Sequence, residues 1–304
     1  MSKTTDKMKE ASQKIVDLME REGTNSVKPW ISTAAAHNVI SKKAYRGMNT
    51  VWLGLSAYEN DYTSNEWATF KQWNELGATI NKGEKATDIF FFNRIVKKDE
   101  ETGKDKSIGL CKYLTVFNAN QVSGYQSPVK ASKSAFSISA VDNYVANTGA
   151  DISHGKDSAF FSPVADFIGM PNKTDFESVE GYYSTLLHEL THWTGHSSRL
   201  DRNMSTLKSD EEYAKEELVA ECGSALLCTL LGVTREPTPN HAKYLNAWIS
   251  RIKDNPKTIF TAMSKAQKAI DFLGEFQCKK DNGKGVYKKT SVVVYPSLKG
   301  AYND

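Results

Sequence analysis

The sequence predicts an α+β protein of two domains, with an N-terminal α+β domain over residues 1–130 and a mainly helical C-terminal domain over residues 131–304. A chain of 304 residues is long enough for two cores of ordinary size, and 39% of its residues are hydrophobic, which is typical of a folded protein. Strand-like patterns gather before residue 118, whereas helical spacing of apolar residues dominates after residue 174.

The N-terminal domain is expected to contain two helices and three strands. Residues 3–23 have apolar side chains at helical spacing and end at a glycine, which suits the end of a helix. A second helix is expected over residues 65–77. Strands are expected at residues 78–80, 88–95 and 110–117, separated by charged segments rich in turn-forming residues.

A linker and two long helices are expected in the rest of the chain. Residues 119–135 are rich in serine and other small residues, which places the domain boundary there. Residues 174–177, Thr-Asp-Phe-Glu, fit a capping box at the start of a helix. Another helix is predicted from Tyr213 to Leu231, ending at Gly232, and its second half is apolar on nearly every side. A helix of that kind is buried.

The composition favours a cytoplasmic protein and predicts no membrane segment. No stretch approaches 18 uninterrupted apolar residues, and the first residues lack the apolar run of a signal peptide. The cysteines form no Cys-x-x-Cys pair and are too few for a disulfide scaffold. We expect all four to be reduced and mostly buried: Cys111, Cys222, Cys228 and Cys278.

Charge and aromatic residues are unevenly distributed. The net charge is +3, and residues 1–130 carry 19 basic against 15 acidic side chains. Four of the six tryptophans also lie in this part. Rings that stack on bases, interleaved with basic side chains that follow the phosphates, are what a single-strand binder needs. The charge difference alone is too small to indicate nucleic-acid binding, and the rings would serve equally well as core residues.

The most informative motif is His188-Glu-Leu-Thr-His192, a metal-binding pattern on a helix. Two histidines four apart on a helix are rotated by only about 40° and separated by about 6 Å along the axis, so both can reach one ion. Glu189 would project beside the ion, where it could accept a proton from water. Both histidines lie away from the apolar stripe of their helix, on either a solvated face or a second buried face.

A third ligand is expected on the downstream helix. Glu217 is assigned as that ligand, and Glu221, one turn later, is expected to orient a histidine by accepting its second ring proton. Glu216 is rotated about 100° away and is expected to face solvent. His196 would lie about 12 Å from His188 along a continuous helix, too far to share the ion unless the helix breaks at Gly195. Ser198 occupies the position at which a metzincin has its third histidine, which excludes that class.

At these residues the chain resembles the ArdC-type antirestriction proteins of mobile genetic elements, over most of its length. The motifs of the second domain are His188 to His196, Ser198 to Arg202 and Tyr213 to Glu221. Those of the first domain are Tyr45 to Asn49, Trp67 to Gln72, Gly77 with Lys82 to Lys85, and Val116 to Gln121. The last 30 residues match no pattern.

The resemblance implies an N-terminal domain that binds single-stranded DNA and a C-terminal zincin-like metallopeptidase domain. It implies a bound Zn²⁺ or another divalent metal such as Mn²⁺, and protection of incoming plasmid or phage DNA from host restriction, as during conjugation. By this resemblance Arg46, Lys82 and Lys85 would contact phosphates, with Trp67 and Phe70 as stacking rings. Lys82 to Lys85 would equally form a charged turn, and the two rings a buried helical stripe.

Two other functions remain open at the level of sequence. The protein could be a cytoplasmic zinc metalloprotease that acts on a host protein, such as a restriction protein, with the first domain serving only for recruitment. It could instead be a non-catalytic DNA-binding protein whose metal braces the helices. The ligand set does not identify the metal, because the same ligands hold Zn, Mn, Co or Ni.

Overall fold

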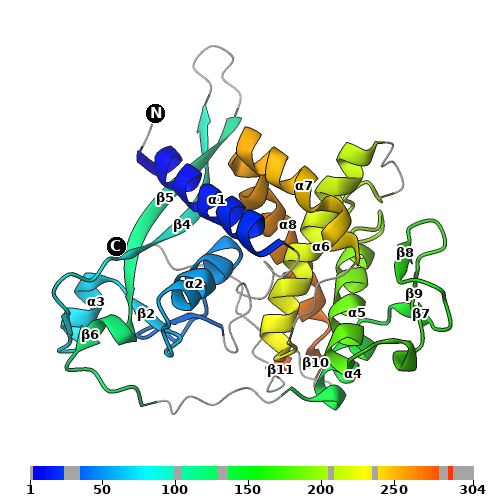
Figure 1. The fold of residues 1–304 in the computed structure, drawn as a ribbon, viewed down its shortest axis with the longest axis horizontal. Coiled ribbons are helices and arrows are strands. Elements are labelled where there is room, and N and C mark those ends of the chain that lie inside the picture. The colour runs from blue at the N-terminus through cyan, green and yellow to red at the C-terminus, as the bar shows by residue number, and fades with distance from the viewer. Residues whose placement is uncertain are drawn as a thin grey trace.

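The computed structural model contains helices and strands in the α+β arrangement that the sequence predicts (Figure 1). It describes residues 3–23, 35–98, 105–128, 136–204, 209–234, 239–280 and 287–289.

The N-terminal part is built on a four-stranded sheet of order β1-β2-β5-β4. The strands are β1 (His37–Asn38), β2 (Glu66–Ala68), β4 (Thr87–Lys98) and β5 (Asp105–Asn118), and β1 and β2 are parallel whereas the other pairs are antiparallel. The β4–β5 hairpin extends away from the body of the molecule (Figure 1). Helix α2 (Met48–Glu59) packs against β4.

The predicted helix over residues 65–77 is wrong in its first half. Residues Glu66–Ala68 form β2, and the helix α3 spans only Phe70–Glu75. Thr69 separates the two elements because its side chain accepts a hydrogen bond from the Gln72 backbone and caps the helix. A small sheet of β3 (Thr79–Ile80) and β6 (Val122–Ser123) follows it. The strands predicted at residues 88–95 and 110–117 are confirmed, because β4 and β5 include these two ranges.

The second part is mainly helical, with α6 at its centre. Its helices are α4 (Ile138–Asn147), α5 (Val179–Trp193), α6 (Asp210–Leu231), α7 (Pro239–Asp254) and α8 (Lys257–Glu275). Helix α6 packs against α5, α7 and α8. Helix α6 is buried along most of its length and ends at Gly232 in a left-handed conformation, as predicted. A three-stranded sheet of order β7-β9-β8 lies beside α5: β7 (Asp151–Ser153), β8 (Phe160–Ser162) and β9 (Phe167–Gly169).

The predicted capping box at residues 174–177 does not start a helix. Thr174 lies in a short 3-10 helix, Lys173–Asp175, and the chain is extended at Phe176. Helix α5 begins at Val179, because Ser178 accepts a hydrogen bond from the Gly181 backbone and provides the cap.

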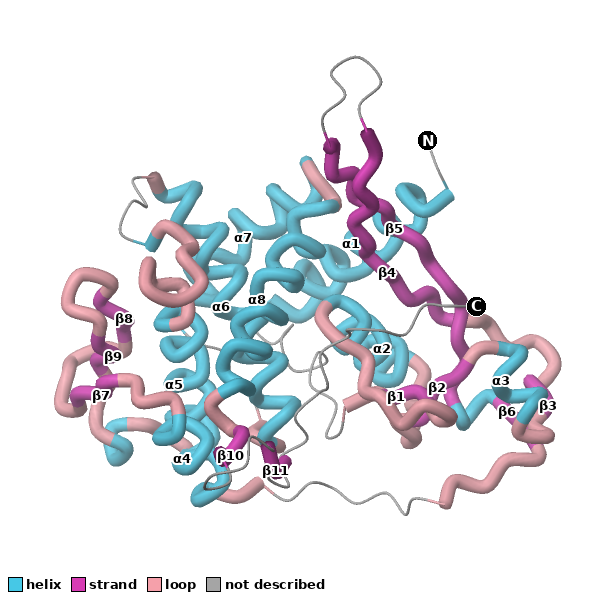
Figure 2. Tube along the Cα trace, turned by 180° about the vertical axis from the view of Figure 1, so that it is seen from behind, coloured by secondary structure: helices cyan, strands magenta, loops and turns pink. Residues whose placement is uncertain are grey.

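Helix α1 (Lys3–Glu22) packs against α7 and α8 of the C-terminal part (Figure 2). One buried cluster contains Ile15 and Met19 of α1 together with Trp248 of α7 and Ile259 of α8. The N-terminal helix therefore contributes to the core of the C-terminal part. The predicted domain boundary at residue 130 lies outside the described residues.

The described thiols fit the expectation from composition. Cys111, Cys222 and Cys228 are free, and the last two are buried. Burial raises the pKa of each of these two thiols, which keeps them in the unreactive neutral form. The side chain of Cys278 lies outside the described residues. Among the helices that the structure describes, none is long and apolar enough to cross a membrane.

Candidate metal centre

Helix α5 carries the two histidines and Glu189 on a buried face. Its core stripe includes Tyr183 and Leu187, and the opposite face is also covered, because α6 packs across it. His188, Glu189 and His192 are 1%, 4% and 6% exposed. Of the two alternatives that the sequence left open, the buried face is therefore correct.

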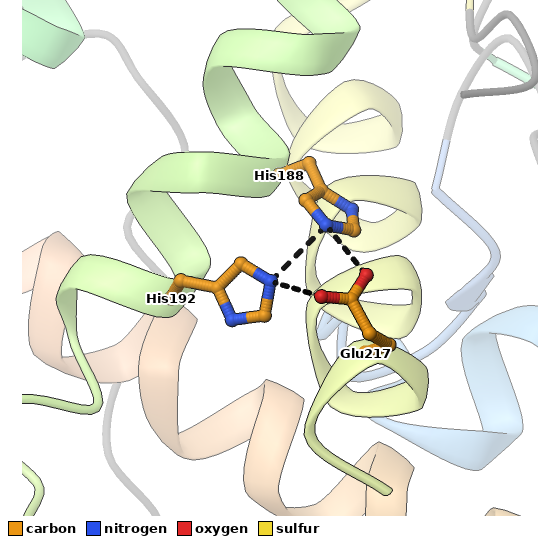
Figure 3. A group of neighbouring side chains, drawn as sticks. All are labelled: His188, His192 and Glu217. Atoms are coloured by element: carbon orange, nitrogen blue, oxygen red, sulfur yellow. Dashed lines mark hydrogen bonds and ion pairs between the residues drawn. The ribbon is translucent and has the colours of Figure 1, made fainter. Parts of the chain in front are cut away.

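Glu217 of α6 meets both histidines of α5 (Figure 3). His188 Nε2 lies 3.4 Å from Glu217 Oε2, and His192 Nε2 lies 3.3 Å from Glu217 Oε1. The two Nε2 atoms are 3.2 Å apart. Two nitrogen ligands at about 2.0–2.1 Å from a tetrahedral ion are separated by roughly 3.3 Å, so the histidines already have the spacing of a metal site.

The chemistry of this group fits a divalent cation. One ligand atom of each residue lies within 4.8 Å of the others, and all three residues are buried. The buried Glu217 Oε2 accepts no hydrogen bond from the described residues, although it lies beside an imidazole nitrogen. A buried carboxylate oxygen without a donor is costly, and an ion between it and the two imidazoles would remove that cost.

A carboxylate lies behind each histidine. His188 Nδ1 is 3.6 Å from Glu221 Oε1, which is an ion-pair distance and too long for a hydrogen bond, so the orienting role of Glu221 stays a prediction. His192 Nδ1 is 3.3 Å from Glu216 Oε1. The prediction that Glu216 faces solvent is wrong, because this residue is only 5% exposed.

Glu216 can be buried because Arg202 neutralises it. The Arg202 Nε atom lies 3.1 Å from both carboxylate oxygens of Glu216, and Nη2 lies 2.8 Å from Oε1. Arg202 follows helix α5 by nine residues, and the chain returns through a tight turn that the hydrogen bond from the Arg202 backbone to Gly195 closes. Arg202 ends one of the motifs of the second domain, but the sequence alone assigned it no role, although a buried acid on α6 requires a cation nearby.

The charges in the centre shift the ionisation of its members in opposite directions. Burial lowers the pKa of His192, but the Glu217 charge and hydrogen bonds to Glu216 and Glu217 outweigh it and raise that pKa to about 10. Burial alone would raise the pKa of Glu217, yet the two histidines hold it well below its ordinary value. The pKa of Glu189 is raised, mainly by burial.

Two further residues reach the centre. Tyr213, one turn before Glu217 on α6, hydrogen-bonds to the Glu217 carboxylate; burial and this acid raise the pKa of the phenol. The Phe161 backbone in β8 hydrogen-bonds to Glu189, so the edge strand lies against the predicted proton acceptor. His196 is outside the group that could hold a metal; helix α5 ends at Trp193, before this residue, and His196 Nδ1 lies 2.7 Å from Ser198 Oγ.

The predicted DNA contacts occupy different environments. Trp67 is 1% exposed on β2, so its ring is not available for stacking, and it does not share a helix with Phe70. Phe70, at the start of α3, is 57% exposed. Lys82 and Lys85 are exposed in the turn between β3 and β4, whereas Arg46 forms an ion pair with Asp271 of α8.

Lys85 also lines a groove of about 530 Å³ between α1, α2 and the start of β4. Its lining includes the rings of Trp52 and Tyr62, and Lys14 lies over the Trp52 ring at 5.4 Å from the centroid. The groove combines basic, aromatic and acidic side chains, the acids being Glu10, Glu59, Glu84 and Asp88.

Comparison with known families gives two matches that leave a gap between them. Residues 5–117 match the N-terminal domain of anti-restriction factor ArdC, and residues 139–265 match a zincin-like metallopeptidase. The predicted boundary at residue 130 falls in the gap and stays a prediction.

Solved structures and curated relatives resemble the chain over most of its length. The Mn(II)-bound crystal structure of the antirestriction ArdC protein from the R388 plasmid is 36% identical, with a TM-score of 0.75 over 91% of this chain and 98% of that one. The metal-free structure is 38% identical, with a TM-score of 0.74 over 88% and 97% of the two chains. The uncharacterized protein y4eC of Sinorhizobium fredii is 32% identical over 88% of this chain and 92% of its own. DNA primase TraC of Escherichia coli is 36% identical over 80% of this chain, which spans only 24% of TraC.

Proposed function

The chain belongs to the family of ArdC-type antirestriction proteins, and on that premise we propose that it protects the DNA of a mobile genetic element from host restriction. In this proposal the N-terminal part binds single-stranded DNA. The C-terminal part holds a divalent metal, Zn²⁺ or Mn²⁺, between His188, His192 and Glu217. The observation that carries the proposal is the meeting of these three buried side chains from two helices.

The site is suited to hydrolysis assisted by a metal. A divalent ion held by the three residues would supply Lewis acidity and lower the pKa of water that reaches it. Glu189 would accept the proton, and its raised pKa brings it nearer to the pH at which a general base works best. Glu221 and Glu216 would hold the two imidazoles with Nε2 turned toward the ion.

The DNA-binding half of the proposal is supported by exposed side chains of the right chemistry. Lys82 and Lys85 are free to reach phosphates, and Phe70 offers an exposed ring to a base. Binding should be sensitive to salt, because each phosphate contact releases counterions. We expect little preference for sequence, since stacking and phosphate contacts do not distinguish the bases.

A metalloprotease that acts on a host protein is the second candidate, and Glu189 favours it. A purely structural zinc site normally has four protein ligands, whereas the group in the described residues has three members together with a neighbouring acid. The third candidate, a metal that only braces α5 and α6, is favoured by the burial of every ligand.

Glu189→Gln separates these candidates. The variant should keep about one metal per chain by elemental analysis, because Glu189 is not among the ligands. If hydrolysis contributes to function, protection of transferred DNA should fall toward the level without the protein, while binding of a labelled single strand is unchanged. Full protection by this variant would favour the bracing metal. Equal and weak binding of single and double strands at low salt would contradict the DNA-binding half.

A further inference from the structure

A buried arginine, Arg202, lies behind the proposed metal ligands and has no role in the proposed function. Arg202 is 6% exposed and Glu216 is 5% exposed, so both charges are removed from water. Isolated buried charges are strongly unfavourable, and an arginine paired through its planar fork is the usual solution.

Arg202 joins the end of α5 to α6. Its Nη2 lies 2.7 Å from the Thr191 carbonyl and its Nη1 lies 2.8 Å from Thr194 Oγ1, at the last turn of α5. Its Nε and Nη2 hold the carboxylate of Glu216 on α6. The last carbonyls of a helix lack partners within the helix, so a guanidinium is well placed to satisfy one.

The metal ligand His192 lies between the two ends of this connection. It follows Thr191 on α5, and its Nδ1 is 3.3 Å from the Glu216 oxygen that Arg202 also contacts. The order of contacts is therefore Arg202, Glu216, His192 and then Glu217. The hydrogen bonds from Arg202 hold the Glu216 carboxylate in one orientation. The carboxylate in turn fixes the orientation of the His192 imidazole.

The two histidines are held differently. Glu221, which lies behind His188, is on the same helix as Glu217, and its contact with His188 joins α6 to α5. Glu216 requires the turn after α5 to bring a cation to it. The backbone of that turn is closed by hydrogen bonds from Leu200 to Thr194 and from Arg202 to Gly195.

Gly195 leaves the space that Arg202 occupies. A Cβ on residue 195 would lie 2.8 Å from Arg202 Nη2, 2.9 Å from its Cζ and 3.0 Å from the His192 backbone oxygen. Those distances are too short for a real contact, and the guanidinium cannot move aside without leaving Glu216 or Thr191. The backbone of Gly195 does not have a positive φ, so the space beside Arg202 and the His192 carbonyl is the reason for a glycine there.

We propose that Arg202 and Glu216 are positioning residues that hold the His192 imidazole in its metal-binding orientation and so set the affinity of the centre for a divalent ion. This inference rests on the proposed metal site and goes beyond it. Neither residue touches the ion. They act on the ligand through a chain of charged hydrogen bonds that runs from the turn after α5.

The test measures metal affinity in the full-length protein, with Mn²⁺ and Zn²⁺ as the probes. Competition with a fluorescent chelator gives the dissociation constant, and the visible absorption of the Co²⁺-loaded protein reports the geometry of the ligands. Glu216→Gln, Arg202→Met and Gly195→Ala should each weaken binding by about 10–100-fold, the usual effect of a residue that supports a metal ligand. Each should also change the Co²⁺ spectrum.

Arg199→Met is the matched control. Arg199 lies on the same turn, is buried to a similar degree and pairs with Asp166, but it contacts no metal ligand. It should lower the melting temperature and leave the dissociation constant and the Co²⁺ spectrum unchanged. Equal loss of affinity in Arg199→Met would overturn the proposal in favour of a general effect of stability.

The variants also separate positioning from folding. Gly195→Ala keeps both charged groups, so it provides a folded variant if the loss of Arg202 prevents folding. Combining Arg202→Met with Glu216→Gln removes both buried charges, which should restore part of the melting temperature but not the metal affinity. Wild-type affinity in all of these variants would overturn the positioning role alone. A wild-type protein that binds none of the three ions would overturn the proposed metal site itself.

Discussion

Gly223 of α6 lies so close to Thr191 of α5 that no side chain fits between the two helices: a Cβ on residue 223 would lie 2.6 Å from Thr191 Oγ1. Thr191 precedes the ligand His192, and Gly223 lies between the metal-facing half of α6 and its apolar half. The close approach of these two residues therefore sets how near Glu217 comes to the histidines.

Gly223→Ala should separate the helices and weaken the centre. The added methyl group must displace Thr191, whose hydroxyl bonds the Leu187 carbonyl, and overpacking of this kind costs about 1–3 kcal/mol. We expect that loss in the free energy of unfolding, measured with urea, together with weaker Mn²⁺ binding. Gly274→Ala is the control, because a Cβ there meets no atom within 4 Å. If both variants unfold like the wild type, the spacing of α5 and α6 does not depend on Gly223.

Metal binding should stabilise the protein, and a chelator should reverse the effect. An ion that binds only the folded chain adds about 2.7 kcal/mol when its free concentration is 100 times the dissociation constant. Melting temperatures with EDTA, and with Mn²⁺ or Zn²⁺ added back, measure this directly. The increase should vanish in His192→Ala, which lacks one of the three ligands. An equal increase in that variant would place the stabilising ion elsewhere.

The affinity of the centre for metal should rise with pH. Without an ion, the pKa of His192 is raised to about 10, so its ring is protonated at neutral pH and must lose a proton when it binds a metal. The pKa of Glu217 is lowered, so this carboxylate is already ionised and releases no proton. Raising the pH removes the proton that competes, and affinity should increase by about tenfold per pH unit for one proton displaced.

Competition with a chelator at pH 6, 7 and 8, corrected for the protonation of the chelator, measures that slope. Calorimetry in two buffers with different heats of ionisation counts the proton independently. A flat profile, with no proton released, would show that His192 is neutral before the metal binds.

The group of His188, His192 and Glu217 could be predicted from the sequence because its spacing lies within two helices. Positions 188 and 192 share a face of α5, and positions 217 and 221 share a face of α6, so helical periodicity predicts each pair and the packing of α5 against α6 joins them. Glu216 was placed wrongly for the same reason. A single helix shows which way a side chain points, but not that Arg202 returns from the following turn to cover it.

Short strands and long-range packing could not be predicted from the periodicity of the sequence. Trp67 lies on a strand of three residues, Glu66–Ala68, which is too short to show an alternating pattern. The packing of α1 against α7 joins segments more than 200 residues apart. The amphipathic pattern of each helix shows that one face is buried, but not which helix covers that face.

Trp67 and Phe70 should behave in opposite ways when truncated. Trp67→Ala removes a fully buried ring that packs edge-on against Tyr62, so it should lower the free energy of unfolding by about 3–5 kcal/mol. Phe70→Ala removes an exposed ring and should change that free energy by no more than about 0.5 kcal/mol. If Phe70 stacks on a base, its loss should weaken binding of a short single strand by about 1–3 kcal/mol.

Urea unfolding and fluorescence anisotropy of a labelled oligonucleotide test the two effects separately. Leu76→Ala provides the comparison, since it removes another exposed apolar side chain just beyond α3. A Phe70→Ala protein that binds the oligonucleotide as tightly as Leu76→Ala and the wild type would exclude stacking at this ring.

Arg46 can contact a phosphate only by exchanging its present partner. Its guanidinium pairs with Asp271 of α8, and Gln267 donates to the same carboxylate while it accepts from the Gly47 backbone at the start of α2. An exposed pair of this kind contributes up to about 1 kcal/mol, which is close to a fivefold change in an equilibrium constant. A phosphate that binds Arg46 must therefore displace Asp271.

Asp271→Asn should accordingly strengthen binding of single-stranded DNA by about fivefold at low salt, and Arg46→Ala should weaken it and reduce the salt dependence by about one phosphate contact. Glu275→Gln removes the same charge one turn later on α8, so it corrects for the change in net charge. The gain must exceed that of Glu275→Gln, and it must disappear when Asp271→Asn is combined with Arg46→Ala. A gain that survives in the combined variant would make the Arg46–Asp271 pair a contact between the turn before α2 and helix α8, with no part in binding DNA.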